Sequence, residues 1–196
     1  FVIDLDQDIQ ELNSHVANKT KHVLYLLNQS VAIECPHLNV PWFTRSFYLK
    51  GTELDDANNA NLRIIINSLN RLSGNNGYVL SPARTPYAHR IDALMYFDPN
   101  SGIVKCDDVQ SGNLLLDIEK IALLCLRHHD FCYKSDILTG KCQAYIRQLQ
   151  ILGYYVVLFT EKELSSMEFY FEEALDEFIS TKINTAVSSQ VFMTSQ

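Results

Sequence analysis

Apolar residues recur every three or four positions along the first third of the chain. From residue 5 to residue 29 this spacing predicts an amphipathic helix, with acids near its start and lysines later, as the helix dipole favours. Cys35-Pro36 ends that helix, because proline disfavours helix at the residue before it. Pro41 fits the first turn of a second helix, and residues 60–72 predict a third. The N-terminal third is therefore predicted to be helical.

After residue 77 the pattern changes to short apolar segments typical of strands. Residues 78–80 and 91–97 are predicted strands, and a turn after the second leads to a return strand over 103–106, which makes a hairpin. Residues 118–126 form a largely continuous apolar run, as expected of a strand buried on both faces. Residues 154–159 predict a second buried strand.

Two helices complete the predicted order. Residues 139–152 have helical spacing and end at Gly153, so that strand, helix and strand form a crossover unit. Residues 161–180 predict an acidic amphipathic helix, and the polar residues 185–196 predict a flexible tail. The predicted fold class is α/β (α+β), with a boundary near residues 74–85 between a helical part and the rest.

Composition narrows the class of protein. The 196 residues are 47% hydrophobic, which excludes wholesale disorder, and no stretch approaches the apolar length of a membrane span, so no membrane insertion is expected. The net charge is −7, of which −5 lies in residues 161–196. This balance argues against non-specific nucleic-acid binding by the chain as a whole. A local basic face is expected only from the neutral segment 84–147, where eight acids match eight bases.

The five cysteines are scattered and odd in number, which predicts reduced thiols and an intracellular compartment. The chain begins Phe-Val-Ile-Asp, without a Met, an apolar signal core or an Arg-rich presequence. We therefore expect a mature or excised piece of a longer protein.

Two segments carry a family resemblance. Residues 26–43, which include Cys35-Pro36 and Pro41-Trp42-Phe43, resemble the LNxxVxxxCPxxxxPWF stretch of the FAST-kinase family. A second set of motifs, running from Thr85-Pro86-Tyr87 to Met167, is similar to the C-terminal end of that family, including its RAP domain, whose signature spans roughly residues 115–172. The two motifs occur in the family's order and spacing, and together they cover most of the chain.

The resemblance implies a mitochondrial matrix protein that acts in the processing, stability or translation of mitochondrial transcripts. It divides the chain into a helical FAST-kinase-like subdomain (residues 1–80) and a hairpin plus RAP domain (81–184), followed by the tail. It also implies that the RAP domain shares the fold of PD-(D/E)XK (restriction-endonuclease-like) nucleases, in a degenerate form. The strand and helix order read from the pattern agrees with that core.

A nuclease of that fold needs carboxylates that hold Mg²⁺ against the phosphate. Asp92 stands at the first such position, but the RAP pattern's glutamate is replaced by Leu124, which cannot ligate a metal. Asp117 or Glu119 would have to substitute from a shifted depth. Asp92 is therefore a candidate relic of a site, or a residue that hydrogen-bonds locally. We expect no catalytic residue and no cofactor, with Mg²⁺ required only if the chain is a ribonuclease.

The sequence gives little support for two other kinds of chemistry, phosphoryl transfer and zinc binding. Phosphoryl transfer is rejected because the chain has no Gly-rich phosphate loop, no Val-Ala-Ile-Lys strand and no Asp-Phe-Gly motif. Cys125, His128, His129 and Cys132 offer zinc ligands, but the spacing is not that of a zinc ribbon, and Cys125 lies in a predicted buried strand. No metal site is predicted.

RNA contacts require cations for phosphates and flat groups for bases. The candidates lie at the hairpin entry and around the strand–helix connection, which flank one cleft in the nuclease-like fold: Arg84, Tyr87, His89, Arg90, Arg127, His128, Lys134, Lys141 and Arg147. The alternative is that Lys141 and Arg147 lie on a solvated helix face and that Tyr87 packs beside Pro86.

The remaining expectations concern core and partners. Trp42 and Phe43 are predicted core anchors, and the acidic C-terminal helix is a solvated face or, as the lesser alternative, a surface for protein partners. The favoured function is a non-catalytic module that binds single-stranded mitochondrial transcripts. The alternatives are a metal-dependent ribonuclease that uses Asp92 and a protein-interaction module without RNA affinity of its own.

Overall fold

The computed structural model describes residues 14–39, 60–74, 77–99, 102–111, 118–167 and 171–194. The chain divides into two compact units, Phe1–Asp55 and Asp56–Gln196. The sequence pattern predicts a boundary near residues 74–85, and the helix over residues 60–72 lies in the second unit. Each unit is described by itself.

In the first unit, helix α2 (Ser14–Glu34) is followed by the short 3₁₀ helix η1 (Pro36–Leu38). The break at Cys35-Pro36 confirms the prediction, and Pro36 occupies the first turn of η1, where its missing N–H is not needed. Asn39 closes η1 in the left-handed conformation, with φ of 48°. The predicted helix at Pro41 and the core anchors Trp42 and Phe43 lie outside the described residues.

In the second unit, the described residues form a mixed main sheet in the order β1-β4-β6-β7, with β5 paired to β4 beside β1. β4 is antiparallel to β1, β5 and β6, whereas β6 and β7 are parallel and joined by α6. The predicted crossover unit is therefore present. Its strands are β1 (Val79–Leu80), β4 (Ala93–Asp98), β5 (Gly102–Val104), β6 (Glu119–Leu126) and β7 (Tyr154–Thr160).

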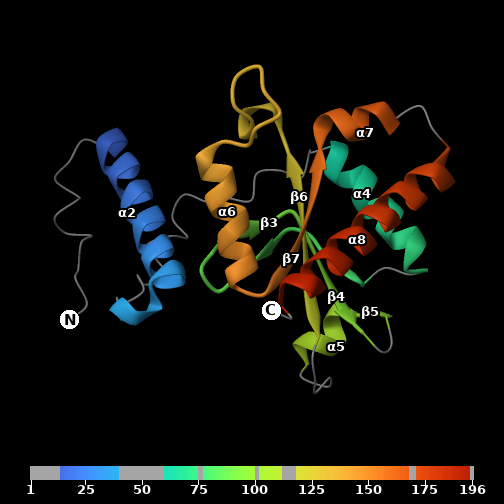
Figure 1. Ribbon diagram of the computed structural model, residues 1–196. Helices are drawn as coiled ribbons and strands as arrows, with labels where there is room; N and C mark the ends of the chain where they lie inside the picture. Colours follow the sequence, from blue (N-terminus) through green and yellow to red (C-terminus); the bar gives the residue numbers. More distant parts are fainter. Residues whose placement is uncertain are drawn as a thin grey trace. The chain divides into compact units, whose positions relative to one another are not determined.

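Helices cover both faces of this sheet, which makes the fold class α/β, as predicted (Figure 1). On one face lie α4 (Ala60–Leu72), α7 (Glu161–Met167) and α8 (Glu172–Thr194). On the other lie α6 (Gly140–Ile151) and a small hairpin of β2 (Ala83–Arg84) and β3 (Arg90–Ile91). The central strand β6 contributes Ile121 and Leu123 to the first core and Ala122 and Leu124 to the second, which confirms that its apolar run is buried on both faces.

Two elements differ from the sequence prediction. The return strand of the hairpin ends at Val104, and Cys106 begins a short helix, α5 (Cys106–Gln110). The single helix predicted over 161–180 is two helices, because α8 starts anew at Glu172, where two glutamates meet the positive end of its dipole. α8 also continues through Thr194, past the start of the predicted tail, because Ala186 and Val187 keep a helical face packed on the core.

An ion pair ties α4 to α8. The Arg71 guanidinium donates to the two carboxylate oxygens of Asp176 at 2.7 and 3.0 Å, and the hydroxyl of the fully buried Ser68 donates to Asp176 at 2.5 Å. The hydrogen bond from Arg71 is the main reason that the pKa of Asp176 lies below its usual value. Asp176, an acid of the C-terminal helix, therefore stabilises the contact between α4 and α8.

Candidate nucleic-acid interface

The carboxyl ends of the parallel strands β6 and β7 meet at one edge of the sheet. The connection 127–139 leaves β6 there, at the top of Figure 1, and α7 follows β7 directly at the same edge. Open α/β sheets place ligand sites outside the carboxyl ends of their strands. The cavities at this edge are therefore the first place to look for function.

Asp92 lies between β3 and β4, beside this edge. The pairing of β4 with β6 ends at Ala93–Leu123, and the Asp92 carboxylate accepts the next N–H of β6, that of Cys125, at 2.8 Å. The Asp92 carbonyl accepts a hydrogen bond from the Ser81 hydroxyl at 2.7 Å. Asp92 thus hydrogen-bonds locally, as one of the two sequence interpretations predicts.

Leu124, at the position where the resemblance implies a nuclease glutamate, follows Leu123, which pairs with Ala93 next to Asp92. The Leu124 side chain is 5% exposed and belongs to the core under α6. Glu119 does not replace it, because Glu119 pairs with Phe97 at the other end of β4, five residues or about 16 Å from Asp92. Asp117 lies outside the described residues. Among the residues that the structure does describe, no three His, Cys, Asp or Glu side chains gather to hold a metal.

A cavity of about 570 Å³, here called the β6 cleft, opens beside Asp92. Three of the predicted RNA-binding cations line it: Arg90 from β3, Arg127 after β6, and Lys141 from the first turn of α6. Its wall also contains two carboxylates, an imidazole, two thiols and an aromatic ring, from Asp92, Asp130, His129, Cys125, Cys142 and Tyr145. The cleft therefore gathers cations from three elements far apart in the sequence.

A second cavity of about 850 Å³, here called the loop groove, lies between the connection 127–139 and the start of α7. The predicted residues His128 and Lys134 line it, and Leu126 and Arg127 line both the groove and the cleft. The two cavities are therefore neighbours that share a wall. Tyr133 and Lys162 also line the groove, and no motif in the sequence marks them as site residues.

The connection 127–139 holds its shape through its own hydrogen bonds. Asp130 accepts the Arg127 N–H at 2.8 Å through its side chain and the Thr139 N–H at 2.8 Å through its carbonyl. The Cys132 N–H donates to Ile137 O at 2.8 Å. Thr139 then caps α6, accepting the Cys142 N–H at 3.4 Å. The polar side chains at its rim are thus carried on a defined backbone.

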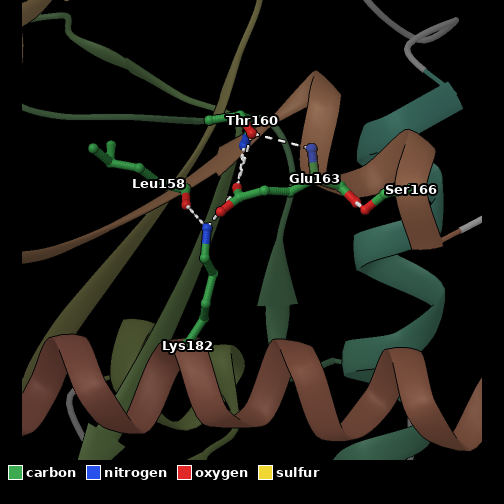
Figure 2. A network of polar contacts seen from close by, with 5 residues as sticks. All are labelled: Leu158, Thr160, Glu163, Ser166 and Lys182. Atoms are coloured by element: carbon green, nitrogen blue, oxygen red, sulfur yellow. Dashed lines mark hydrogen bonds and ion pairs between the residues drawn. The ribbon is translucent and has the colours of Figure 1, made fainter. Parts of the chain in front are cut away.

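The start of α7 forms the other wall of the loop groove and is fixed by a capping box (Figure 2). Glu163 accepts the Thr160 N–H and hydroxyl, both at 2.9 Å, and Thr160 accepts the Glu163 N–H at 3.2 Å. Lys182 of α8 reaches across to Glu163 at 2.6 Å and to the Leu158 carbonyl at 2.8 Å. Burial acts to raise the pKa of Glu163, but these hydrogen bonds outweigh it, and the pKa lies below its usual value. The Thr-x-x-Glu spacing signals this box in the sequence.

His89, a predicted RNA contact, lies inside the protein. Its ring is 1% exposed, with Nε2 2.9 Å from Gln148 Oε1 and Nδ1 3.2 Å from the Thr85 hydroxyl. Burial lowers its pKa, although the hydrogen bond to Gln148 acts in the opposite direction. The neutral ring joins the small hairpin to α6, and it packs edge-on against Tyr145 with 5.1 Å between the ring centroids. His89 therefore holds the small hairpin against α6, and both elements contribute residues to the cleft wall.

The remaining predicted contacts lie around the two cavities. Arg84 and Tyr87 are half-buried on the small hairpin, where Arg84 pairs with Arg90 across the strands. Arg147 is exposed on α6, outside the lining of either cavity. The structure thus brings Arg90, Arg127 and Lys141 together at one opening, and His128 and Lys134 at the next.

Among the described residues, the cysteines near the site belong to no group of three side chains that could hold a metal. Burial, reinforced by the Asp92 carboxylate and opposed by Arg127, raises the pKa of Cys125 to about 12, which keeps the thiol protonated. Cys132 is exposed in the connection, with its sulfur 3.9 Å from the Leu138 carbonyl.

No helix among the described residues is both long and apolar enough to cross a membrane.

Comparisons with known proteins find a matching family model and several related proteins. The model of the family described as FAST kinase-like protein, subdomain 2, matches residues 21–105. FAST kinase domain-containing protein 1, mitochondrial, is 27% identical in Xenopus laevis and 26% identical in Homo sapiens, over 94% and 91% of this chain. Human FAST kinase domain-containing protein 2, mitochondrial, is 28% identical over 59% of the chain. No solved structure matches.

The chain spans about a quarter of the length of the first of these relatives, 25% of the Xenopus laevis protein and 23% of the human one. The relatives are named as mitochondrial proteins, which confirms the predicted mitochondrial location. Residues 21–105 therefore match the FAST kinase-like subdomain 2 family model, and the chain is homologous to the mitochondrial FAST kinase domain-containing proteins 1 and 2.

Proposed function

We propose that this chain is a non-catalytic module that binds single-stranded RNA through the β6 cleft and acts in the processing, stability or translation of mitochondrial transcripts. The observation that carries the proposal is the convergence of Arg90, Arg127 and Lys141 on one opening beside Asp92. Phosphate contacts supply most of the affinity in RNA binding, and lysine and arginine make them.

The fold adds support. An antiparallel strand pair followed by β6, α6 and β7 is the order expected of a PD-(D/E)XK core. In such a core Asp92 and Leu124 would stand at the first and second carboxylate positions. We propose that residues 115–172 are a RAP domain in which the nuclease site has lost its metal and kept a cationic opening. Leu124 is packed in the core, which supports binding without cleavage.

Most of the acidic excess lies outside the cleft lining: −5 of the net −7 falls in residues 161–196, whereas residues 84–147 carry eight acids and eight bases. Asp176 pairs with Arg71, and Glu163 pairs with Lys182, both on the face of the sheet opposite α6. Asp92 and Asp130 in the cleft wall each accept a backbone N–H, which offsets part of their charge. Lys141, in contrast, is exposed in the wall of the cleft.

The test is binding of the 196-residue chain to a labelled single-stranded RNA at low and moderate salt, with Mg²⁺ and with EDTA. The RNA is examined afterwards on a denaturing gel. We expect salt-sensitive binding in both buffers and intact RNA. Cleavage that needs Mg²⁺ and disappears in Asp92→Ala would instead identify a ribonuclease. Absence of binding at low salt would leave a protein-interaction module.

Lys141→Gln is the variant that locates the binding. Removing one phosphate contact is expected to weaken binding roughly three- to tenfold and to reduce the slope of log affinity against log salt by about 0.7. Lys120→Gln is the matched control, because Lys120 is also exposed but lies at the amino end of β6. Equal effects of the two substitutions would show attraction by overall charge and contradict binding at the cleft.

A further inference from the structure

The loop groove continues the wall of the β6 cleft and has the size of a ligand site. Its volume of about 850 Å³ falls within the range of small-molecule pockets. Arg127 stands between the two cavities, so a chain whose phosphates cross the cleft meets the groove next. The groove is formed by rigid parts, the hydrogen-bonded connection on one side and the capped start of α7 on the other.

Tyr133 is the unusual side chain of the groove. It is 88% exposed, although tyrosine is an aromatic residue that proteins normally cover in large part. It stands in the turn over residues 132–135, which the Ser135 N–H closes on Cys132 O at 3.1 Å. Lys134 follows with φ of 51°, in the left-handed region that a lysine rarely adopts. This backbone presents an aromatic ring and a cation together at the rim.

Charge and hydrogen-bonding groups complete the groove. The Lys134 ammonium lies 5.3 Å from the centre of the Tyr133 ring, and Lys162 and His128 are exposed in the same lining. Ser135 and Ser165 offer hydroxyl groups, while Asp136 and Glu161 are the acids of the lining. Cations beside an exposed ring suit a nucleotide, whose phosphate is negative and whose base has a flat face.

We infer that the loop groove binds one unpaired nucleotide of the RNA that crosses the β6 cleft, with its base stacked on Tyr133 and its phosphate beside Lys134. This inference rests on the proposed function and goes beyond it by assigning a base-binding subsite. Stacking on an aromatic ring tolerates any base. The subsite therefore selects single-stranded over double-stranded RNA and does not select a sequence.

The experiment compares a labelled ten-nucleotide oligouridine with an RNA of the same length in which all bases are absent. We expect the abasic RNA to bind the wild-type chain roughly tenfold more weakly. Tyr133→Ala should lose about the same factor for oligouridine and nothing for the abasic RNA, whereas Tyr133→Phe should bind both RNAs as the wild type does. Phe171→Ala is the control, because Phe171 is also 85% exposed but lies between α7 and α8, outside the groove.

The outcomes separate the two proposals. Salt-sensitive binding that is equal for both RNAs, or unchanged in Tyr133→Ala, would overturn the base subsite and leave the β6 cleft in place. Absence of RNA binding by the wild-type chain would overturn both. Because Tyr133 is exposed, the variant should keep the wild-type thermal unfolding midpoint. As a second readout, the fluorescence of Tyr133→Trp should be quenched by oligouridine and not by the abasic RNA.

Discussion

The elements that cover the two faces of the main sheet are held by different kinds of polar interaction. On the face covered by α4, α7 and α8, ion pairs join the helices: Arg71 of α4 pairs with Asp176 of α8, and Lys182 of α8 pairs with Glu163 of α7. On the face covered by α6, the His89 ring makes polar contacts with Gln148 and Thr85. The first face therefore has ion pairs between its helices, whereas the cations at the end of β6 line open cavities.

In a chain with an acidic net charge, an anion such as RNA is expected to bind only where cations gather locally. Of the net charge of −7, −5 lies in residues 161–196, and none of those that the structure describes lines the β6 cleft. Charges that are paired inside a fold contribute little to the field outside. Local arrangement, more than the sum of charges, decides where RNA is expected to bind.

The largest effect on stability is expected from breaking the ion pair between α4 and α8. Asp176→Ala removes the acceptor of both Arg71 and the buried Ser68, and should lower the free energy of unfolding by about 2 kcal/mol. Glu177→Ala, at an exposed position of the same helix, should change it by less than about 0.5 kcal/mol. Urea unfolding measures both, and equal stability of the two variants would show that this pair does not hold the helices. RNA affinity should be unchanged in each.

The pH dependence of stability distinguishes the two faces. His89 has a native pKa below its usual value, so the unfolded chain binds that proton more readily, and stability should fall as the pH drops through about 6.5. Asp176 and Glu163 also have lowered native pKa values, so the stability that they add above pH about 4 is lost below it. Urea unfolding from pH 7.5 to 3.5 should show both steps. His89→Gln should remove the upper one and the exposed control His128→Gln should not; an upper step that persists in His89→Gln would refute this assignment.

The smallest effect is expected from alkylating the exposed thiol near the site. Iodoacetamide should label Cys132 in the folded chain, with little change in stability. Cys125, whose pKa is raised to about 12, should react roughly a thousandfold more slowly than an ordinary thiol. Peptide mapping by mass spectrometry measures the two rates. Comparable labelling of Cys125 and Cys132 under native conditions would contradict the buried environment of Cys125 beside Asp92.

Strong periodicity made much of the fold predictable. The spacing in residues 60–72 and the apolar runs of β6 and β7 predict those elements nearly to the residue, because burial on one or both faces leaves a direct mark in sequence. The boundary between α7 and α8 is not visible in that pattern, since apolar residues continue across it at helical spacing. The capping box of Thr160 and Glu163 was the available signal for where α7 begins.

The sequence predicts which types of residue line the candidate site, but it does not predict which of those side chains are buried or exposed. Arg90, Arg127 and Lys141 converge because β3, β6 and α6 meet at one edge, which the crossover unit anticipates. His89 has the same chemistry as a surface histidine, but its partner Gln148 lies 59 positions away, and only the folded chain shows the contact. Nothing in the sequence marks Tyr133, because its significance comes from being left uncovered.

The central claim is that RNA meets this chain at the carboxyl end of β6. Ultraviolet cross-linking of a 4-thiouridine-labelled single-stranded RNA, followed by mass spectrometry of the attached peptides, tests it most directly. The account predicts cross-links within residues 127–141, and in particular at Tyr133, at salt concentrations where the RNA is bound. Cross-links confined to α8 or to the first unit would contradict it.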